Sequence, residues 1–323
     1  MPVPGKEVPN SDDSAISYHR PFLRSALARS LYDRMMREEQ LRKLDKSKWY
    51  HCDLQQIGDQ NSSLVNKFVQ MDLDEEGSQF IDTCYQKSDW FVTHLYHSVA
   101  RSFLNLFMTS TSINGLLDRG SMFVFSARQL QSLYPDLESV KDQPDSRLLD
   151  LGAGDGKVTQ VMAQFFKETY VTEVSPVMRR ILSRKGYSAL EVEDWHESSR
   201  SFDLISCLNL LDRCDKPLTI LNQMISRLKP DGRIMMALVL PISQYVESGR
   251  PGHLSDDHRP SEILNVTGDT FEQQLLSLER NILTPAGLEI VKWTRLPYLC
   301  EGDLDLSFYW LHDVVMLLRR RPE

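Results

Sequence analysis

Cysteine is scarce in this sequence, and no two cysteines stand at a spacing that binds metal. The five cysteines, an odd number, occur at positions 52, 84, 207, 214 and 300. Without a Cys-x-x-Cys pair they carry neither a zinc signature nor a disulfide framework. His51 beside Cys52 has no matching second pair. We therefore predict reduced, buried thiols and no metal site.

Long apolar runs are also missing. A membrane-spanning helix needs about 20 mostly apolar residues, and the chain contains no such run. The first 14 residues are polar and acidic, and they contain no apolar signal region. We expect a disordered tail over residues 1–15 and, from this N-terminus, a cytoplasmic location.

The third absence is an excess of basic residues. Lysine and arginine together number 37, against 45 aspartates and glutamates, which gives a net charge of −8. Nonspecific nucleic-acid binding needs a basic surface, so we predict no nucleic-acid partner. The acidic balance suits a neutral or cationic substrate. A length of 323 residues allows one large domain or two smaller ones and leaves the oligomeric state open.

The most informative stretch that is present runs from Leu148 to Gly156, a short apolar strand followed by three glycines. An apolar-periodic segment from 158 to 165 then predicts a helix. A dinucleotide fingerprint would place its third glycine where Lys157 stands. Asp150, at the strand end, would repel a pyrophosphate but could receive an ammonium. The pattern resembles the first motif of class I S-adenosylmethionine-dependent methyltransferases; an ordinary strand-to-helix turn is the alternative.

Strand and helix patterns alternate after this turn. Glu173 would end the second strand, where an acidic side chain bonds ribose hydroxyls. Asp194 and Trp195 would end the third, where a carboxylate and an indole suit the edge and face of an adenine. Helices are predicted near 176–185 and 217–228. The five expected parallel strands are followed by a final pair, one of them antiparallel. The strands are expected at 148–151, 171–174, 189–195, 202–208, 232–240, 288–294 and 309–318.

This alternation predicts an α/β fold. We expect the Rossmann-like, mostly parallel seven-stranded sheet of class I methyltransferases within residues 141–323. Residues 16–140 are expected to form a helical N-terminal extension that packs on this core. Its arginine-rich segment 15–47 could lie on a membrane or hold a partner. Because acidic residues return within it, we prefer a helix that packs on the domain.

Smaller features outside the strands complete this prediction. Ser126 is a plausible N-cap for a helix near 127–134. Residues 62–110 have the apolar spacing of helices, with a strong stripe from Trp90 to Phe107. Residues 241–260 are expected to form a surface insertion near the carboxyl edge of the sheet, and a helix is expected over 270–283.

Two clusters could carry chemistry at that edge. The first follows the fourth strand: Asn209 could bond the amino-acid end of a cofactor or the substrate, Asp212 has no obvious structural role, and Asp215 fits an N-cap ahead of Pro217. The second is a predicted loop over 295–303 with the nearby Tyr309. It reads either as a pocket wall or as a rigid turn with solvated acids.

Several longer motifs together resemble the DREV family of methyltransferases. They are Thr111–Leu117, Arg119–Ser126, Leu148–Gly156, Ser206–Asp215 and Thr294–Asp303. The resemblance covers about residues 25–318. It implies S-adenosylmethionine as cofactor, S-adenosylhomocysteine as product, and protein-histidine methylation at the pros nitrogen. It also implies protein substrates that carry His-x-His motifs with small spacers. Familiar members begin with an apolar, signal-like segment. That makes the endoplasmic reticulum or mitochondrion the alternative location.

The resemblance also suggests roles for individual residues. It places Glu173 and Asn209 at the cofactor, and Asp212, Tyr298 and Tyr309 around the cofactor and the target imidazole. We therefore expect Asp212 and Tyr309 to be catalytic. The cofactor set is Asp150, Gly152, Gly154, Glu173, Asp194, Trp195, Asn209 and Tyr298. The substrate set is Asp212, Tyr298, Glu301, Asp303 and Tyr309.

Two other functions stay open on the same fold, because a fold does not fix a substrate. One is methylation of another protein site or of a small molecule. The other is a cofactor-binding scaffold without turnover, against which the intact Asp150, Gly152, Gly154, Glu173 and Asp212 argue.

Overall fold

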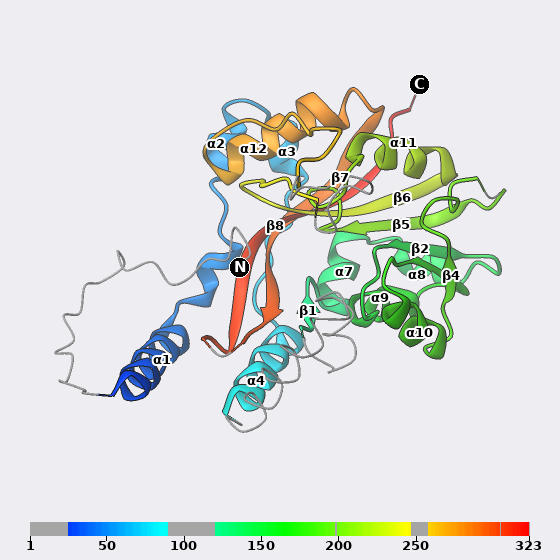
Figure 1. Ribbon diagram of the computed structural model, residues 1–323. Helices are drawn as coiled ribbons and strands as arrows, with labels where there is room; N and C mark the ends of the chain where they lie inside the picture. The colour runs from blue at the N-terminus through cyan, green and yellow to red at the C-terminus, as the bar shows by residue number, and fades with distance from the viewer. Residues whose placement is uncertain (1–24, 90–119, 198, 247–257, 304, 323) are drawn as a thin grey trace.

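The computed structural model describes residues 25–89, 120–197, 199–246, 258–303 and 305–322 (Figure 1). A single twisted sheet of eight strands runs through this part of the chain in the order β1-β7-β8-β6-β5-β2-β3-β4. The central pairs are parallel, whereas β8 runs antiparallel to both β6 and β7. The strands are β1 (Met122–Phe123), β2 (Arg147–Leu151), β3 (Glu168–Thr172), β4 (Ser188–Leu190), β5 (Phe202–Leu208), β6 (Leu228–Val239), β7 (Leu288–Glu301) and β8 (Phe308–Arg320).

This topology confirms the predicted class I arrangement, with an antiparallel strand inserted between β6 and β7. It also corrects the expected strands. An eighth strand, β1, pairs with the outer edge of β7. The third predicted strand shortens to the three residues of β4, the fifth begins four residues earlier, and β7 continues through the region expected to be a loop. Pro297 is tolerated in β7 because the neighbouring edge strand β1 is only two residues long and pairs with Leu299 and Cys300, so it does not reach Pro297.

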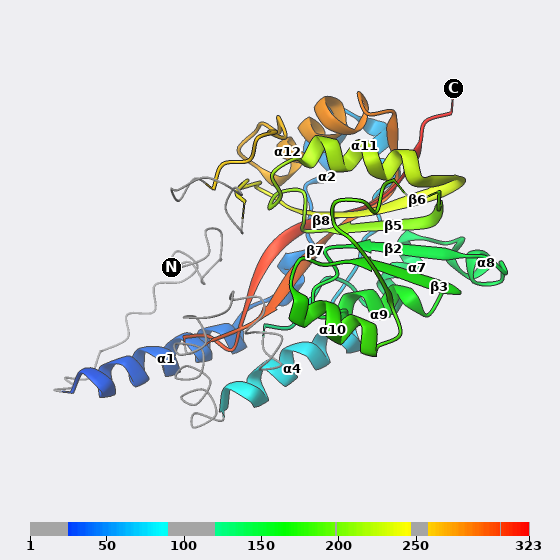
Figure 2. The same ribbon diagram turned by 45° about the vertical axis from the view of Figure 1, so that its right-hand side comes forward.

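Helices cover both faces of the sheet (Figure 2). Successive strand residues alternate between two apolar cores, as the pleat requires: Leu148 and Met235 belong to one, and Leu149 and Met236 to the other. The helices are α1 (Ala26–Lys43), α2 (Leu54–Gly58), α3 (Ser62–Asn66), α4 (Glu75–Asp89), α7 (Ala127–Leu133), α8 (Leu137–Lys141), α9 (Lys157–Ala163), α10 (Pro176–Arg184), α11 (Pro217–Arg227) and α12 (Phe271–Leu278), with the 3₁₀ helix η1 (Lys46–Tyr50) and the π-helix η2 (Glu279–Leu283). Side chains of α1, α4, α7, α8 and α9 join the first core, and those of α2, α3, α11 and α12 join the second.

The β7–β8 hairpin extends beyond the rest of the sheet, and its tip lies near α1 and α4 (Figure 1). Glu38 of α1 accepts hydrogen bonds from the backbone and hydroxyl of Ser307 at 2.7 and 2.8 Å. Trp49 of η1 packs its ring 5.5 Å from Trp310 of β8. The segment Lys46–Tyr50 is therefore helical, and it packs against the hairpin.

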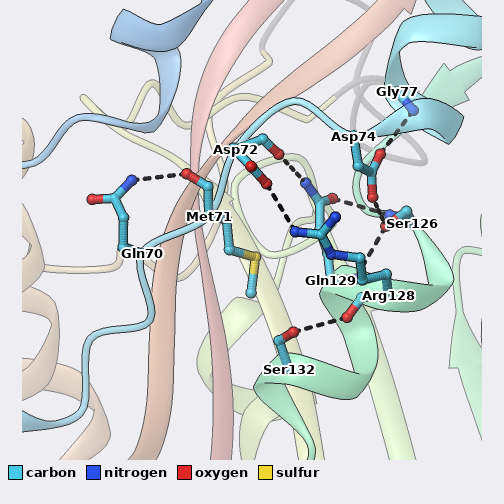
Figure 3. A network of polar contacts seen from close by, with 9 residues as sticks. All are labelled: Gln70, Met71, Asp72, Asp74, Gly77, Ser126, Arg128, Gln129 and Ser132. Carbon is cyan, nitrogen blue, oxygen red and sulfur yellow. Dashed lines mark hydrogen bonds and ion pairs between the residues drawn. The ribbon is translucent and has the colours of Figure 1, made fainter.

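The N-terminus of α7 is held by the segment before α4 (Figure 3). Ser126 is the predicted N-cap, and it forms a full capping box with Gln129. Its hydroxyl also donates to Asp74, whose other oxygen accepts the amide hydrogen of Gly77 at 3.0 Å. Asp72 adds an ion pair with Arg128 at 3.3 Å. These contacts fix the path of the chain into β1 and α7.

The start of α11 corrects a prediction about Asp215. The N-cap position of α11 is Lys216, and Asp215 accepts instead from the amide of Ser261 at 2.8 Å. The side chain of Glu262 accepts from the backbone amide of Thr219 at 2.8 Å, in the first turn of α11. The chain after β6 therefore returns over the carboxyl edge of the sheet and caps α11 from a distance.

The predicted tail over residues 1–15 and the apolar stripe from Trp90 to Phe107 lie outside the described residues. So does most of the insertion after residue 246. Among the helices of the described segments, none is both long and apolar enough to cross a membrane.

Candidate active site

The glycine loop joins β2 to α9 at the carboxyl edge of the sheet. Gly152, Gly154 and Gly156 adopt φ values of +70°, +56° and +74°, a left-handed region that favours glycine. The amide of Ala153 donates to the carbonyl of Thr172 at 3.0 Å. A Cβ at Gly154 would find its nearest neighbour, the methyl of Met122, 4.0 Å away. The loop is thus tied to the end of β3 and leaves room above Gly154.

Glu173 directly follows β3, where the sequence predicted it. One carboxylate oxygen accepts from the amide of Gly154 at 3.0 Å, and the other accepts from the amide of Ser175 at 2.8 Å. Each oxygen can accept a further hydrogen bond. Glu173 therefore holds the glycine loop in place and can still receive hydroxyl donors from a ligand.

Asp150 is buried at the end of β2. It accepts hydrogen bonds from the hydroxyl of Ser206 on β5 at 2.6 Å and from that of Thr159 on α9 at 2.5 Å. Burial raises the pKa of Asp150 to about 6, although these two hydrogen bonds act in the opposite direction. The carboxyl group links three elements under the glycine loop, and its predicted contact with an ammonium stays a prediction.

The two residues expected at the end of the third strand differ in burial. Both fall in the turn that follows β4. Trp195 is 5% exposed and belongs to the apolar core shared with Leu149 and Leu151 of β2. Asp194 is exposed. The structure thus assigns the indole a place in the core beside the site, and the adenine contacts of both residues stay predictions.

Asn209 is the first residue after β5, and its φ of +53° is the one left-handed value of a non-glycine residue in the described part of the chain. Its backbone amide donates to the carbonyl of Ala237 on β6 at 2.9 Å. Its side-chain amide donates to a carboxylate oxygen of Asp313 on β8 at 2.7 Å. Asn209 therefore reaches across the end of β6 at the carboxyl edge.

Asp212 lies three residues further on, and it is 4% exposed. One carboxylate oxygen is 3.6 Å from the Nε of Arg213. The Arg213 guanidinium also lies 5.9 Å from the centre of the Tyr298 ring on β7. Burial raises the pKa of Tyr298 well above its usual value, and the nearby Cys300, Asp313 and Asp212 add to this, against Arg213. The structure thus brings Asn209, Asp212 and Tyr298 together around one edge.

Asp313 is the member of this cluster that the sequence reasoning missed. It is fully buried in the middle of β8, opposite Val239 of β6 and Leu296 of β7. Burial raises its pKa well above the usual value. The signal was present in the sequence, since Asp313 is the one carboxylate in this strand and, with the preceding His312, interrupts an apolar and aromatic run from 308 to 318; such a carboxylate is rare without a polar partner.

The other predicted pocket residues form separate contacts along the hairpin. Tyr309 is nearly buried and donates its hydroxyl to Asp303 at 2.7 Å. Glu301 is buried, pairs with Lys87 of α4 at 3.1 Å, and accepts from the amide of Ser121 at 3.3 Å. Because Tyr298 and Tyr309 lie within β7 and β8, most of the predicted loop is part of the sheet.

A hollow of about 330 Å³ adjoins this part of the hairpin, between α4, β1 and the start of α9. Met122, Lys157 and Glu301 are among its lining residues. Lys157 donates to the hydroxyl of Ser121 at 2.5 Å, which fixes β1 beside the first turn of α9. The roles of Glu301, Asp303 and Tyr309 toward a substrate stay predictions.

Several known proteins are similar to this chain. A ubiquinone biosynthesis O-methyltransferase of Xanthomonas campestris pv. campestris is 26% identical over 142 residues, which is 37% of this chain and 59% of that protein. The N-methyltransferase NodS of Bradyrhizobium japonicum WM9, solved with S-adenosyl-l-homocysteine, is 17% identical with a TM-score of 0.36; the match covers 61% of this chain and 87% of NodS. Magnesium protoporphyrin IX methyltransferase of Synechocystis PCC 6803, solved with bound SAM, is 12% identical with a TM-score of 0.37, over 70% of this chain and 97% of that one.

The most extensive match is to a whole family. The model of the DREV methyltransferase family matches residues 49–320, which include every strand of the sheet. The match contains the glycine loop, Glu173, the Asn209–Asp212 segment and the β7–β8 hairpin. This chain therefore belongs to the DREV methyltransferase family.

Proposed function

We propose that this methyltransferase uses S-adenosylmethionine to methylate the pros nitrogen of histidine in proteins that contain His-x-His motifs with small spacers. The buried Asp212 beside Asn209 at the carboxyl edge is the observation that carries the proposal. Membership in the DREV family supports it from an independent direction. In an open α/β sheet this edge, past the ends of the parallel strands, is where ligands bind.

The chain's own residues fit the cofactor. Above Gly154 a ligand meets no Cβ, and Glu173 can accept the ribose hydroxyls. The side-chain oxygen of Asn209 is buried and has no hydrogen-bond partner among the described residues. Such an acceptor suits the ammonium of the cofactor's amino-acid end, because a buried polar atom left unpaired is costly. When bound, S-adenosylmethionine supplies a methyl group on a positively charged sulfur.

Methyl transfer to an imidazole requires the protein mainly to position the two reactants and to stabilise the charge that forms. The pros nitrogen of a neutral imidazole forms the new N–C bond while the C–S bond breaks, and the electron pair of that bond stays on sulfur. The tele nitrogen keeps its proton during attack and needs an acceptor. The Asp212 carboxylate can fix this tautomer and stabilise the imidazolium that forms. The Nε of Arg213 lies 3.6 Å from this carboxylate and places a positive charge beside it.

A labelled-methyl assay tests the proposal directly. The full chain is incubated with methyl-labelled S-adenosylmethionine and a peptide that carries alternating histidines with an alanine or glycine spacer. We expect label on a histidine ring, and mass spectrometry of peptides with each histidine replaced by Ala identifies which ring. Widening the spacer to Leu or Trp should stop the transfer.

Three results would contradict the proposal in different ways. Equal labelling of isolated histidines in unrelated peptides would remove the motif specificity. Label on lysine, on arginine or only on a small phenol would move the chain to another substrate class. Binding of S-adenosylhomocysteine without label on any of these substrates would favour a scaffold.

A further inference from the structure

Asp313 and Asn209 form a buried pair that joins two strands that are not neighbours. Asn209 follows β5 and Asp313 lies in β8, with β6 between them. The side-chain amide of Asn209 spans this gap and donates to Asp313 at 2.7 Å. Asn209 does so with the unusual φ of +53°, so the local backbone is shaped to direct this side chain across β6.

The pair leaves two oxygen atoms without partners. Among the residues that the structure describes, neither the side-chain oxygen of Asn209 nor the second carboxylate oxygen of Asp313 has a hydrogen bond. Asn209 is 7% exposed and Asp313 is fully buried. Most buried polar atoms in proteins are bonded, so a pair of such oxygens at the carboxyl edge indicates a donor that comes from outside the chain.

The planarity of the amide connects the two observations. When the NH₂ group of Asn209 faces Asp313, its carbonyl oxygen must point away from Asp313. Turned the other way, the NH₂ group would lose this acceptor, and the carbonyl could be bonded only by the single O–H that a protonated Asp313 carries. The hydrogen bond to Asp313 therefore holds the amide in the orientation that offers an oxygen acceptor to the site.

We propose that Asp313 is a positioning residue, which holds the Asn209 amide so that its carbonyl oxygen accepts from the ammonium of the cofactor. This inference rests on the proposed use of S-adenosylmethionine. The role explains why a carboxyl group occupies the middle of a buried strand, opposite Val239 and Leu296, where an apolar residue would fit the sheet better.

Two substitutions of matched shape test the role. Asp313→Leu keeps the branching of the side chain but removes the acceptor, whereas Asp313→Asn keeps an acceptor oxygen. By calorimetry, we expect the Kd for S-adenosylhomocysteine to rise about tenfold in Asp313→Leu, the scale of one lost hydrogen bond. In Asp313→Asn the rise should stay within about threefold. The KM for S-adenosylmethionine should follow the Kd, with kcat changed less.

A double substitution separates positioning from a general effect on the fold. Asn209→Ala should weaken binding at least as much as Asp313→Leu, and adding Asp313→Leu to it should cause no further loss, because the amide to be oriented is gone. A purely structural Asp313 would change the melting temperature while leaving the Kd unchanged, and that result would overturn the inference.

The remaining outcomes are also decisive. If Asp313→Leu does not melt cooperatively, the test uses Asp313→Asn, which keeps the acceptor. A tenfold loss of affinity in folded Asp313→Asn would then overturn the inference. Equal affinity in all Asp313 variants and the natural chain would overturn the positioning role alone. Failure of the natural chain itself to bind S-adenosylhomocysteine would overturn the proposed function and the inference together.

Discussion

The two halves of the carboxyl edge differ in how their polar groups are satisfied. On the β2–β3 side, Asp150 and Glu173 each accept two hydrogen bonds from neighbouring elements. On the β5–β8 side, Asn209 and Asp313 share one hydrogen bond and each keep an unpaired oxygen within the described residues. The first half is finished as a scaffold, with Glu173 still able to accept from a ligand, and the second is arranged around groups that the chain does not supply.

This difference separates stability from chemistry. A fully bonded carboxyl group contributes mainly to the fold, because its loss leaves donors of the chain unpaired. A group with an open acceptor position contributes to binding and catalysis, and its retention costs stability. Substitutions of Asp150 and of Asp212 should therefore change different measurements, stability for the first and methyl transfer for the second.

The largest effect is expected from Asp212→Asn, on the open side. The amide can no longer stabilise the developing imidazolium, so methyl transfer to a His-x-His peptide should slow by about 10²–10³-fold, the usual scale of lost transition-state electrostatics. Affinity for S-adenosylhomocysteine should stay near normal. Single-turnover transfer and calorimetry measure the two quantities.

Asp203→Asn is the matched control for this prediction. Asp203 is also a nearly buried aspartate of the β5 region, but it lies at the opposite end of the strand and pairs with Lys229 at 2.9 Å. It should alter stability and leave transfer unchanged. If Asp212→Asn lowers only the melting temperature, Asp212 belongs with the structural carboxylates.

Sequence reasoning predicted most of the fold, because alternating apolar strands and amphipathic helices carry a strong local signal. It also located Glu173, Asn209 and Asp212, since the first two directly follow recognisable strands and Asp212 lies three residues beyond Asn209. It missed β1, which has only two residues, and placed a loop where β7 continues through Pro297. Local patterns do not reveal which distant segment a short or proline-containing strand will pair with.

Long-range polar contacts were the other limit. Asp215 stands where an N-cap would stand, yet Glu262 caps α11, from 43 positions away. Glu301 was expected either on a pocket wall or as a solvated acid in a turn, but it is buried against Lys87 and Ser121. In each case the partner is set by tertiary structure, which the composition of the local segment does not encode.

The second prediction concerns the finished side and depends on pH. The pKa of Asp150 rises from 3.8 to about 6 in the fold. The folded state thus binds the proton more tightly than the unfolded state, so the stabilisation is present below pH 4 and is lost as pH rises through 6. Relative to Asp150→Asn, the natural chain should gain about 2–3 kcal/mol between pH 7 and pH 4.

Urea unfolding of both proteins at several pH values measures this difference. The Asn variant carries no titrating group at 150, so subtraction removes the contribution of other carboxylates. A stability difference that stays constant from pH 7 to pH 4 would mean that the pKa of Asp150 is the same in the folded and unfolded states and is not raised by burial.

The third prediction tests whether the ligand lies directly against Gly154. A valine there should raise the Kd for S-adenosylhomocysteine at least tenfold, about 1.4 kcal/mol, because its branched side chain occupies the space above the loop. Gly287→Val is the control: this glycine has φ +74° and nothing within 4 Å of an added Cβ, but lies between η2 and β7. Both variants should lose stability from the left-handed backbone, and only the first should lose affinity. Similar affinities in the two would place the ligand elsewhere.

The smallest expected effect tests the connection that the chain after β6 makes to the open side. Glu262 accepts from the amide of Thr219, so Glu262→Ala should cost about 1 kcal/mol of unfolding free energy, the usual value of a helix cap. Asp215→Ala should cost less, because the N-cap position of α11 is Lys216 and Asp215 accepts from the amide of Ser261, outside that helix. Glu262→Gln separates the two parts of the effect, since it keeps an acceptor for Thr219 but removes the negative charge near the helix N-terminus.

Urea unfolding ranks the three variants. A greater loss for Asp215→Ala than for Glu262→Ala would restore Asp215 as the cap and would contradict the long-range contact seen here.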